Sequence, residues 1–214
     1  SLHNQDLLVL QEMEYNGLKY DYDKSTVLGD ELDEQISKLN IKLKSFHSYD
    51  NFNPNSGEHL SVFLYGGIIK ERFQCPVGHY KTGLRAGEVK LRWEERDKEF
   101  QRLINPLPNT ELKKEGFFST NEDTLRKLKP KTNDGKEILK IILTRATMQK
   151  RMSTYYHGLV NLIDEMKWKT DTIHGQLNQC VAKTGRLSSS KPNLQNFDGE
   201  IKTLFTTRYG ESNE

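Results

Sequence analysis

Residues 136–166 read KEILKIILTRATMQKRMSTYYHGLVNLIDEM, and this stretch decides the fold. From Ile141 to Met166 its apolar residues recur three, four or seven positions apart, which is the spacing of one face of an α-helix. The stretch therefore predicts one long amphipathic helix, 136–166. Between Lys136 and Val160 this helix carries five basic residues and one acidic residue, so its outer face is basic.

A second helical pattern lies upstream, over residues 23–46. Its apolar residues are also spaced three or four apart and form a single stripe: Leu28, Leu32, Ile36, Leu39, Leu43 and Phe46. Because each long helix has one apolar stripe, we predict that the two pack as an antiparallel pair along their length. The predicted fold class is α+β and mainly helical.

Short polar side chains before apolar runs predict where helices begin. We expect Asp23 or Ser25 to cap the helix over 23–46, Ser56 to cap a short helix, and Thr120 to cap another.

The sequence changes character between the two long helices. Phe73–Val77 and Glu88–Trp93 predict two strands, and the link over 78–87 is basic and rich in glycine. Residues 68–115 are therefore predicted to hold a β-hairpin inserted in a helical region.

Strands are also predicted near both ends of the chain. Residues 5–16 predict a short helix that Gly17 ends, and the alternating residues 18–22 predict a strand. Thr172–His174 and Asn178–Ala182 predict two more strands.

The composition is that of a polar globular protein. Of 214 residues, 34% are hydrophobic and 29% are charged, and nine Phe, nine Tyr and two Trp are available for a core. No run of about 18 apolar residues occurs, so we expect no membrane span. The N-terminal residues lack the basic-then-apolar pattern of a signal peptide. Two distant cysteines exclude a disulfide scaffold, and we expect a reducing, cytoplasmic location.

Charge is distributed unevenly along the chain. Residues 1–66 carry 5 basic and 11 acidic side chains, a net of −6, whereas residues 67–214 carry 27 and 19, a net of +8. This asymmetry indicates either a surface that faces a polyanion or merely an unevenly charged protein.

Residues 184–196 read TGRLSSSKPNLQN and hold the densest group of polar donors. An arginine, three hydroxyls and Asn/Gln/Asn around a proline are donors that can reach base edges or phosphates. A polar surface loop is the alternative. Other candidate sites are weaker, because Cys75, His79, His59 and Cys180 lack metal-ligand spacing and no metal site is expected.

Two further features have ordinary structural interpretations. The carboxylate pairs Asp164–Glu165 and Asp21/Asp23 lie where helix caps or solvated groups are typical. Tyr155 can stack on a base, but its spacing assigns it to the apolar stripe of the long helix.

The segment 184–196 resembles the TGRLSSxxPNLQN motif of family A (Pol I-like) DNA polymerases. Further stretches resemble motifs of that family in the same order along the chain: Met13–Leu18 with Asp21, Phe52–Ser56, Gly116–Leu128, Ser153–Leu159 and His174–Gln179. The resemblance covers essentially the whole chain, and the insert around 78–83 looks like the phage-type members.

The resemblance implies a division into domains. Residues 1–22 would lead into the palm, 23–168 would form the thumb with 68–115 as its inserted hairpin region, and 169–214 would begin the palm with an incomplete antiparallel sheet. The thumb's two long antiparallel helices would lie against the minor groove of primer-template DNA.

The resemblance also implies which residues contact DNA. Arg186 matches an arginine that reads minor-groove acceptors at the primer terminus; these are similar for all correct base pairs, so the contact tests geometry rather than sequence. The other implied DNA-binding residues are Ser188, Ser189, Asn193, Gln195 and Asn196 near the minor groove, Lys150, Ser153 and Thr154 on backbone phosphates, and His174 and Gln179 beside the template path.

The sequence departs from the family pattern in three places. Met152 stands where the family has a lysine, and Arg145 stands one place earlier than the family's helix arginine. Phe197-Asp198 replaces an isoleucine-proline pair. These departures put individual contacts in doubt and leave the assignment intact.

The chain stops at Glu214, about where the family's first catalytic aspartate is expected. The resemblance implies two Mg²⁺ ions held by palm carboxylates of a C-terminal portion, joined to this chain or a separate polypeptide. We therefore expect no catalytic residue here and no activity from this chain alone. It would be a fragment, one product of a split gene, or a piece left by an intein or a proteolytic break.

The predicted function is the primer-template-gripping segment of a DNA-directed DNA polymerase in DNA replication, located in the host cytoplasm if phage-encoded. Two alternatives remain. One is a stand-alone, non-catalytic module that binds duplex nucleic acid. The other is a structural subunit whose main role is assembly with a catalytic half.

Overall fold

The computed structural model describes residues 2–169, 171–179 and 186–206. The chain divides into two compact units, which we call the first unit (Ser1–Ser37 with Ala146–Glu214) and the second unit (Lys38–Arg145). Two helices, α2 (Tyr22–Lys44) and α5 (Asn133–Arg151), carry the chain into and out of the second unit. Each unit has its own hydrophobic core.

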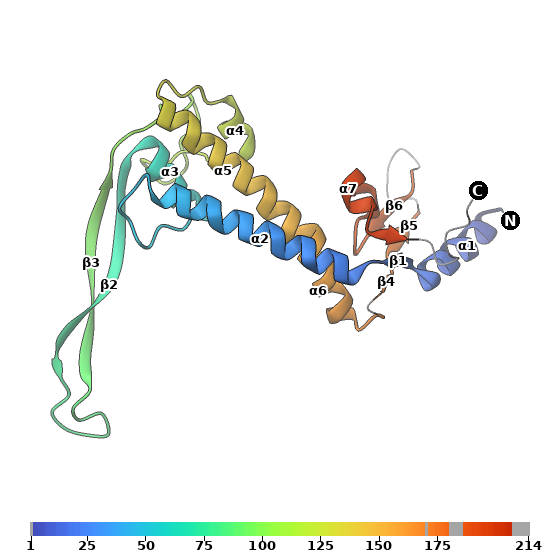
Figure 1. Ribbon diagram of the computed structural model, residues 1–214, viewed down its shortest axis with the longest axis horizontal. Helices are drawn as coiled ribbons and strands as arrows, with labels where there is room; N and C mark the ends of the chain where they lie inside the picture. The colour runs from blue at the N-terminus through green and yellow to red at the C-terminus, as the bar shows by residue number, and fades with distance from the viewer. Residues whose placement is uncertain (1, 170, 180–185, 207–214) are drawn as a thin grey trace. The chain divides into compact units, whose positions relative to one another are not determined.

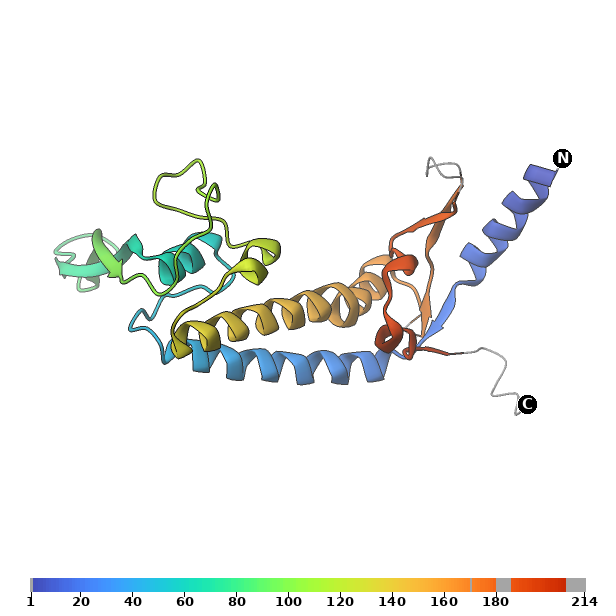
Figure 2. The same cartoon turned by 90° about the horizontal axis from the view of Figure 1, so that it is seen from above.

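Within each unit, α2 lies beside the second long helical run in both views (Figures 1 and 2). As the residue numbers along α2 rise, the residue numbers of their partners on that run fall. The two helices therefore run antiparallel within each unit, as the sequence predicts. The contacts are Tyr22–Asp164 and Ser25–Tyr156 in the first unit, and Asn40–Arg145 and Lys42–Glu137 in the second.

The second long helical run is not a single α-helix, and in this the sequence prediction is wrong. It begins at Asn133 and changes to a π-helical turn over Met152–Tyr156 before α6 (His157–Met166) continues. A Cβ at Gly158 would lie 2.4 Å from the Ser153 carbonyl oxygen, so only glycine fits the widened turn without a shift. The period of three and four persists through the turn, which is why the pattern does not reveal it.

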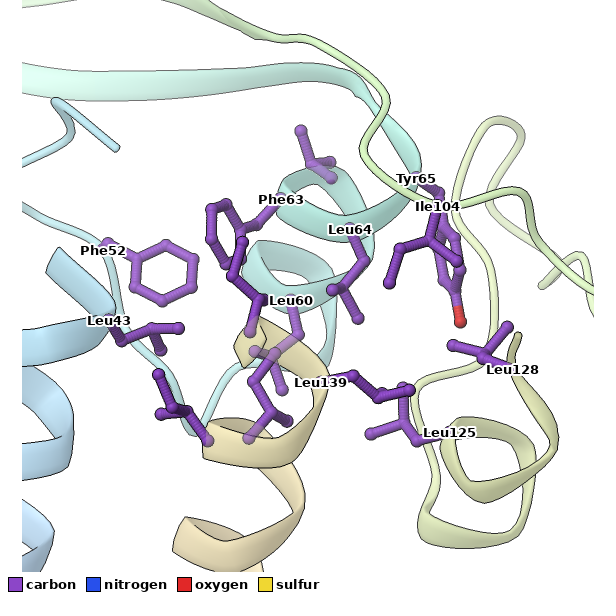
Figure 3. Packing of buried hydrophobic residues seen from close by; sticks show 14 of the residues in the cluster. Leu43, Phe52, Leu60, Phe63, Leu64, Tyr65, Ile104, Leu125, Leu128 and Leu139 are labelled. Atoms are coloured by element: carbon purple, nitrogen blue, oxygen red, sulfur yellow. The ribbon is translucent and has the colours of Figure 1, made fainter. Parts of the chain in front are cut away.

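The core of the second unit gathers around α3 (Gly57–Tyr65). Ser56 caps α3 as predicted, with its hydroxyl accepting from the His59 amide, and Gly66 ends it at φ 78°. Figure 3 shows side chains from α2, α3 and α5 converging with those of the segments beside them. The labelled members are Leu43, Phe52, Leu60, Phe63, Leu64, Tyr65, Ile104, Leu125, Leu128 and Leu139.

The inserted hairpin is present, but it is longer than predicted. β2 (Gly67–His79) pairs with β3 (Val89–Phe100) in a two-stranded antiparallel ribbon that extends away from α3 (Figure 1). The predicted strands cover only the apolar half of each. In the other half, charged partners face each other across the ladder, including Arg72–Glu95 and Glu71–Arg96, and they carry no apolar alternation.

Two helix caps lie one to four residues from their predicted positions. Asp21 rather than Asp23 or Ser25 caps α2, because its Oδ1 accepts from the Lys24 amide at 3.0 Å. Asn121 rather than Thr120 caps α4 (Glu122–Lys127). Several adjacent polar residues satisfy the cap pattern in each case, so the pattern alone does not choose among them.

The first unit surrounds a small antiparallel sheet. Helix α1 (Leu2–Asn16) ends at Gly17, whose φ of 61° suits glycine, and the chain then enters the central strand of the sheet. The sheet order is β4 (Thr172–Ile173), β1 (Leu18–Tyr20), β7 (Phe205–Thr206), and a separate hairpin pairs β5 (Gln176–Asn178) with β6 (Ser188–Ser190). Residues 180–182 of the predicted strand Asn178–Ala182 lie outside the described residues.

The first unit's core lies between these strands and the helices. Its members are Tyr20, Tyr156, Leu159, Ile163, Ile173, Phe197, Ile201 and Leu204. Helix α7 (Gly199–Lys202) supplies Ile201. None of the helices in the described part of the chain is long and apolar enough to cross a bilayer.

Candidate nucleic-acid interface

The eleven residues predicted to contact DNA all belong to the first unit, although the sequence spreads them from 150 to 196. Ten have partly or fully exposed side chains. Ser189 is the exception and is buried. The residues fall into four groups: the PNLQN segment, the β5–β6 hairpin with the residues beside it, the π-turn with the end of α5, and the β4–β5 connection.

The PNLQN segment is a 3₁₀ turn over Leu194–Asn196, held by its own polar side chains. The Asn193 Oδ1 accepts from the Gln195 amide at 3.1 Å, and the Gln195 Nε2 donates to the Leu187 carbonyl at 2.5 Å. The buried Ser189 hydroxyl accepts from the Leu194 amide at 2.9 Å and donates to Asn193 at 3.4 Å. Ser189 therefore shapes the turn, and its burial leaves it no direct access to a ligand.

Serine hydroxyls of β6 form hydrogen bonds with Asn178 of β5. The Asn178 Nδ2 donates to the Ser190 Oγ at 3.1 Å, and the Ser188 Oγ donates to the Asn178 carbonyl at 3.3 Å. Arg186 lies two residues before β6 and is exposed. Thr184 and Gly185, which begin the motif, lie outside the described residues.

The π-turn presents one side to solvent and the other to the core. Lys150, Ser153 and Thr154 are exposed. Tyr155 is half-buried; its hydroxyl donates to the Asn196 carbonyl at 3.1 Å, and its ring packs edge-on to Phe197 at 5.8 Å. This contact supports the core interpretation of Tyr155. It joins the π-turn directly to the PNLQN turn, two motifs about forty residues apart.

A charged network missed by the sequence reasoning supports the same junction. Arg151 pairs with Asp198 at 2.9 Å and Glu200 at 2.7 Å, and the hydrogen bond to Glu200, followed by the Asp198 charge, raises the Arg151 pKa. Asp198 caps α7 through the Glu200 and Ile201 amides. The Ile201 amide is the largest cause of the lowered Asp198 pKa, with Arg151 adding to it.

Two residues that depart from the resembled motif have structural roles here. Phe197, where the motif has an isoleucine, stacks on Phe205 at 5.2 Å, and Asp198, where the motif has a proline, caps α7. The sequence signal was available, because an aspartate directly before Gly-Glu is typical of a helix N-cap.

His174 is held in place by the chain itself. Its Nδ1 lies 2.9 Å from the Glu14 carbonyl, and its ring packs edge-on to Trp168 at 5.2 Å. The Glu14 carboxylate accepts from the Leu177 amide. His174 borders an open hollow of about 580 Å³, whose other lining residues are Tyr15, Asn16, Lys19, Lys169, Asp171 and Thr172. Gln179 follows β5 and is exposed.

Charge divides differently between the units than along the sequence. The first unit holds 11 basic and 16 acidic residues, a net of −5, and the second holds 21 and 14, a net of +7. In the first unit, Arg151 neutralises part of the acidic charge beside the π-turn. The excess positive charge lies on the second unit, where no DNA-contacting residue was predicted.

Metal ligands do not cluster in the described ranges, in which no three His, Cys, Asp or Glu side chains are arranged to hold an ion. Of the carboxylate pairs, Asp21 caps α2 and Asp164 accepts from the Tyr22 hydroxyl at 3.3 Å. These are the structural roles that the sequence favoured.

Comparison with known proteins identifies the family. The family model for DNA polymerase family A, which describes the sequences of that family, matches residues 98–211, more than half of the chain. The chain belongs to DNA polymerase family A. DNA polymerase I of Bacillus caldotenax is 30% identical over 191 residues, covering 88% of this chain. DNA polymerase I of Bacillus subtilis (strain 168) is also 30% identical over 191 residues, covering 89%.

The fold of this family A chain is similar to that of a solved polymerase domain. This domain is the POL domain of Pol1 from M. smegmatis, in complex with DNA primer-template and dNTP. The match covers 91% of the present chain and 27% of the M. smegmatis chain, with a TM-score of 0.56 and 21% identity. The chain spans about 16% of the length of the Bacillus polymerases. The family is thus established for a chain that matches a small part of these relatives. The phage-type assignment stays a prediction.

Proposed function

We propose that this family A chain is the primer-template-gripping segment of a DNA-directed DNA polymerase. Its first unit would contact the minor groove and backbone of the duplex near the primer terminus. Residues 23–168 would act as the thumb, and 1–22 with 169–214 as the first part of the palm. The Pol1 domain of similar fold was solved with primer-template DNA, which supports DNA as the ligand.

The observation that carries this proposal is the Tyr155–Asn196 hydrogen bond. It joins the exposed Lys150, Ser153 and Thr154 to the turn that bears Asn193 and Gln195. Hydroxyl and lysine donors suit phosphates, and amide side chains suit groove acceptors. Two kinds of DNA-contacting group would therefore act from one rigid junction.

We further propose that catalysis by the complete polymerase depends on residues outside this chain. Most of the length of its relatives lies beyond the segment in hand. Palm carboxylates C-terminal to this segment would hold two Mg²⁺ ions, which would supply charge stabilisation for phosphoryl transfer. Here Arg186, Asn193 and Gln195 would position the primer terminus.

Primer extension with Mg²⁺ and dNTPs tests this division of labour. The chain is assayed alone and then mixed with the polypeptide encoded immediately downstream. Extension only in the mixture is expected. Extension by the chain alone would overturn the proposed location of the catalytic carboxylates. Salt-sensitive duplex binding without extension in either case would favour the stand-alone binding module, and assembly without duplex binding would favour the structural subunit.

Replacing Arg186 with alanine tests the role of the arginine. Losing a groove contact of about 1–3 kcal/mol should slow primer extension about 10- to 100-fold in the complete enzyme. Arg186 is exposed, so the unfolding midpoint in urea should stay unchanged. The matched control is Lys202→Ala, which removes an exposed cation of the same unit from α7. Equal extension rates for wild type and Arg186→Ala would contradict the role.

A further inference from the structure

The outer half of the β2–β3 ribbon, residues 74–93, has no core of its own. None of these residues is buried. The inner half is anchored instead: Glu71 is buried and bonds to the Asn51 amide and to the Arg96 guanidinium. The Arg96 hydrogen bond is the largest cause of the lowered Glu71 pKa. A two-stranded ribbon without a packed face gains little stability by itself, so folding alone does not explain the outer half.

Apolar side chains are nevertheless concentrated on the outer half. Trp93 is 64% exposed, Leu91 48% exposed, and Leu84 in the connecting loop is fully exposed. The ladder pairs Gln74 with Trp93 and Pro76 with Leu91, which places these side chains on one face of the ribbon. Val77 and Val89 are also exposed nearby.

Trp93 also borders a shallow hollow of about 530 Å³, shared with Arg72 and Glu95. Arg72 and Glu95 pair with each other at 2.7 Å and form one wall. Tryptophan and arginine beside a hollow are the residue types that contribute most to binding energy at protein interfaces. An exposed apolar group with a polar border marks an interaction surface.

The charge of the outer half identifies the partner's chemistry. Residues 74–93 contain four basic side chains, Lys81, Arg85, Lys90 and Arg92, and one acidic side chain, Glu88, for a net of +3. Arg85 pairs with Glu88 at 2.6 Å and Arg92 with Glu94 at 2.7 Å, so Lys81 and Lys90 carry the positive charge that a partner would complement. Phosphates would complement this charge, but they offer nothing to Leu84, Val89 and Leu91. A protein surface with acidic residues around apolar ones complements both the charge and the apolar face.

We propose that residues 74–93 are a docking site for a protein partner whose contact surface is acidic around exposed apolar side chains. Trp93 and Leu91 form the apolar centre on one face of the ribbon. Lys81 in the connecting loop and Lys90, which alternation places on the opposite face, supply the positive charge beside it. This site lies in the second unit and is separate from the DNA-contacting residues of the first unit.

Selection from a random 16-residue peptide display library tests the proposal directly. The complete chain is the bait, and a chain with Leu91→Asp and Trp93→Ala is used for counter-selection. Both side chains are exposed, so the double variant should fold; its unfolding midpoint in urea checks this. Ile41→Asp is the matched control, because Ile41 is another exposed aliphatic residue of the second unit.

Selected peptides should be enriched in Asp and Glu flanking apolar residues. Affinity of the purified peptides should fall at least 10-fold with the double variant and stay unchanged with Ile41→Asp. It should also fall at least 10-fold with Lys81→Glu and Lys90→Glu, which leave the apolar face intact.

Three results would overturn the proposal. One is peptides without acidic enrichment, or none that distinguish wild type from the double variant. The second is that the same variants lose as much affinity for a 30-base-pair DNA duplex as for the peptides, which would make the ribbon a DNA-contacting surface. The third is a wild-type dimer in sedimentation that the double variant dissociates, which would make the occupant a second copy of the chain.

Discussion

At the scale of single residues, Arg145 anchors a turn of the second unit. Its side chain is 6% exposed, and burial lowers its pKa. Its guanidinium donates to the Asn40 Oδ1 at 2.6 Å, the Asn55 Oδ1 at 2.7 Å and the Pro54 carbonyl at 3.3 Å. One arginine thus fixes the FNPNS turn between α2 and α5 inside the second unit.

Replacing Arg145 with methionine should therefore destabilise the second unit. Methionine keeps the length of the side chain but leaves the Asn40 and Asn55 oxygens without their charged donor. The loss should be about 1–3 kcal/mol, the cost of leaving hydrogen-bond acceptors without their partner. Urea unfolding measures it. Arg145→Lys keeps the charge but has fewer hydrogen-bond donors, so its unfolding free energy should lie between those of wild type and the methionine variant. A methionine variant as stable as wild type would show that the turn does not need the arginine.

Individual residues also show where sequence reasoning ends. Motifs predict that Asn193, Gln195 and Ser189 matter, but a motif does not say which side chain faces a ligand and which holds the turn. Ser189 is buried and bonds to the Leu194 amide. Arg151 was missed because its partners, Asp198 and Glu200, lie nearly fifty positions away. Only folding brings such distant charges together.

At the scale of elements, the π-turn directs the side chains of the STYYHGL segment. One extra residue in the turn changes the direction of the side chains within and after it, so Ser153 and Thr154 face solvent while Tyr155 reaches Asn196. The turn depends on Gly158, because any Cβ there would meet the Ser153 carbonyl oxygen at 2.4 Å. The turn and its glycine thus determine how the predicted phosphate contacts are displayed.

Gly158→Ala should shift or remove the π-turn. The contact is with backbone, which cannot rotate away, so we expect a loss of about 1–3 kcal/mol in unfolding free energy. Because Ser153 and Thr154 would be displaced, affinity for a primer-template duplex should also fall. The control is Gly199→Ala on α7, where a Cβ has open space. Equal stability and affinity for both variants would show that the turn accepts a side chain.

Elements differ in how far the sequence predicts them. The spacing of three and four predicts both long helical runs and their antiparallel packing, because burying one stripe of each leaves few arrangements. It does not reveal the π-turn that divides the second run. The ribbon was predicted too short, because its inner half alternates charges such as Arg72 and Glu95 instead of apolar residues. The Tyr155–Asn196 contact at the candidate interface was not predicted, because periodicity carries no information on contacts between distant segments.

At the scale of the whole molecule, the second unit contains hydrogen bonds that depend on unprotonated histidines. Two histidines of the second unit accept hydrogen bonds from backbone amides through Nδ1: His47 from Tyr49 at 3.1 Å, and His59 from Asn53 at 3.0 Å. A ring nitrogen accepts only when it carries no proton. The His47 ring also packs against Phe52 and Phe63, and within the described residues its buried Nε2 has no partner. Protonation would therefore break contacts that hold the loop before α3.

The direction of the pKa shifts agrees with this geometry. Burial is the main cause that lowers the pKa of His47 and of His59 below the ordinary value of 6.5. Lys44 and Lys98 lower the His47 pKa further, whereas Asp50 raises it and Glu58 raises that of His59. Between the folded and unfolded pKa values, the unfolded chain binds more protons, so stability rises with pH in that window. The contribution is complete above about pH 6.5 and declines as the pH falls toward the folded values.

The second unit should therefore unfold more easily at pH 5.5 than at pH 7.5. Amide hydrogen exchange of α3, corrected for the pH dependence of the intrinsic rate, measures this for the second unit alone. His59→Asn separates titration from packing, because its Oδ1 can accept from the Asn53 amide and does not titrate. It should keep most of the protection at pH 7.5 and lose less on acidification than wild type. An equal loss in both proteins would exclude His59 as a source, and greater protection at pH 5.5 would contradict the lowered pKa values.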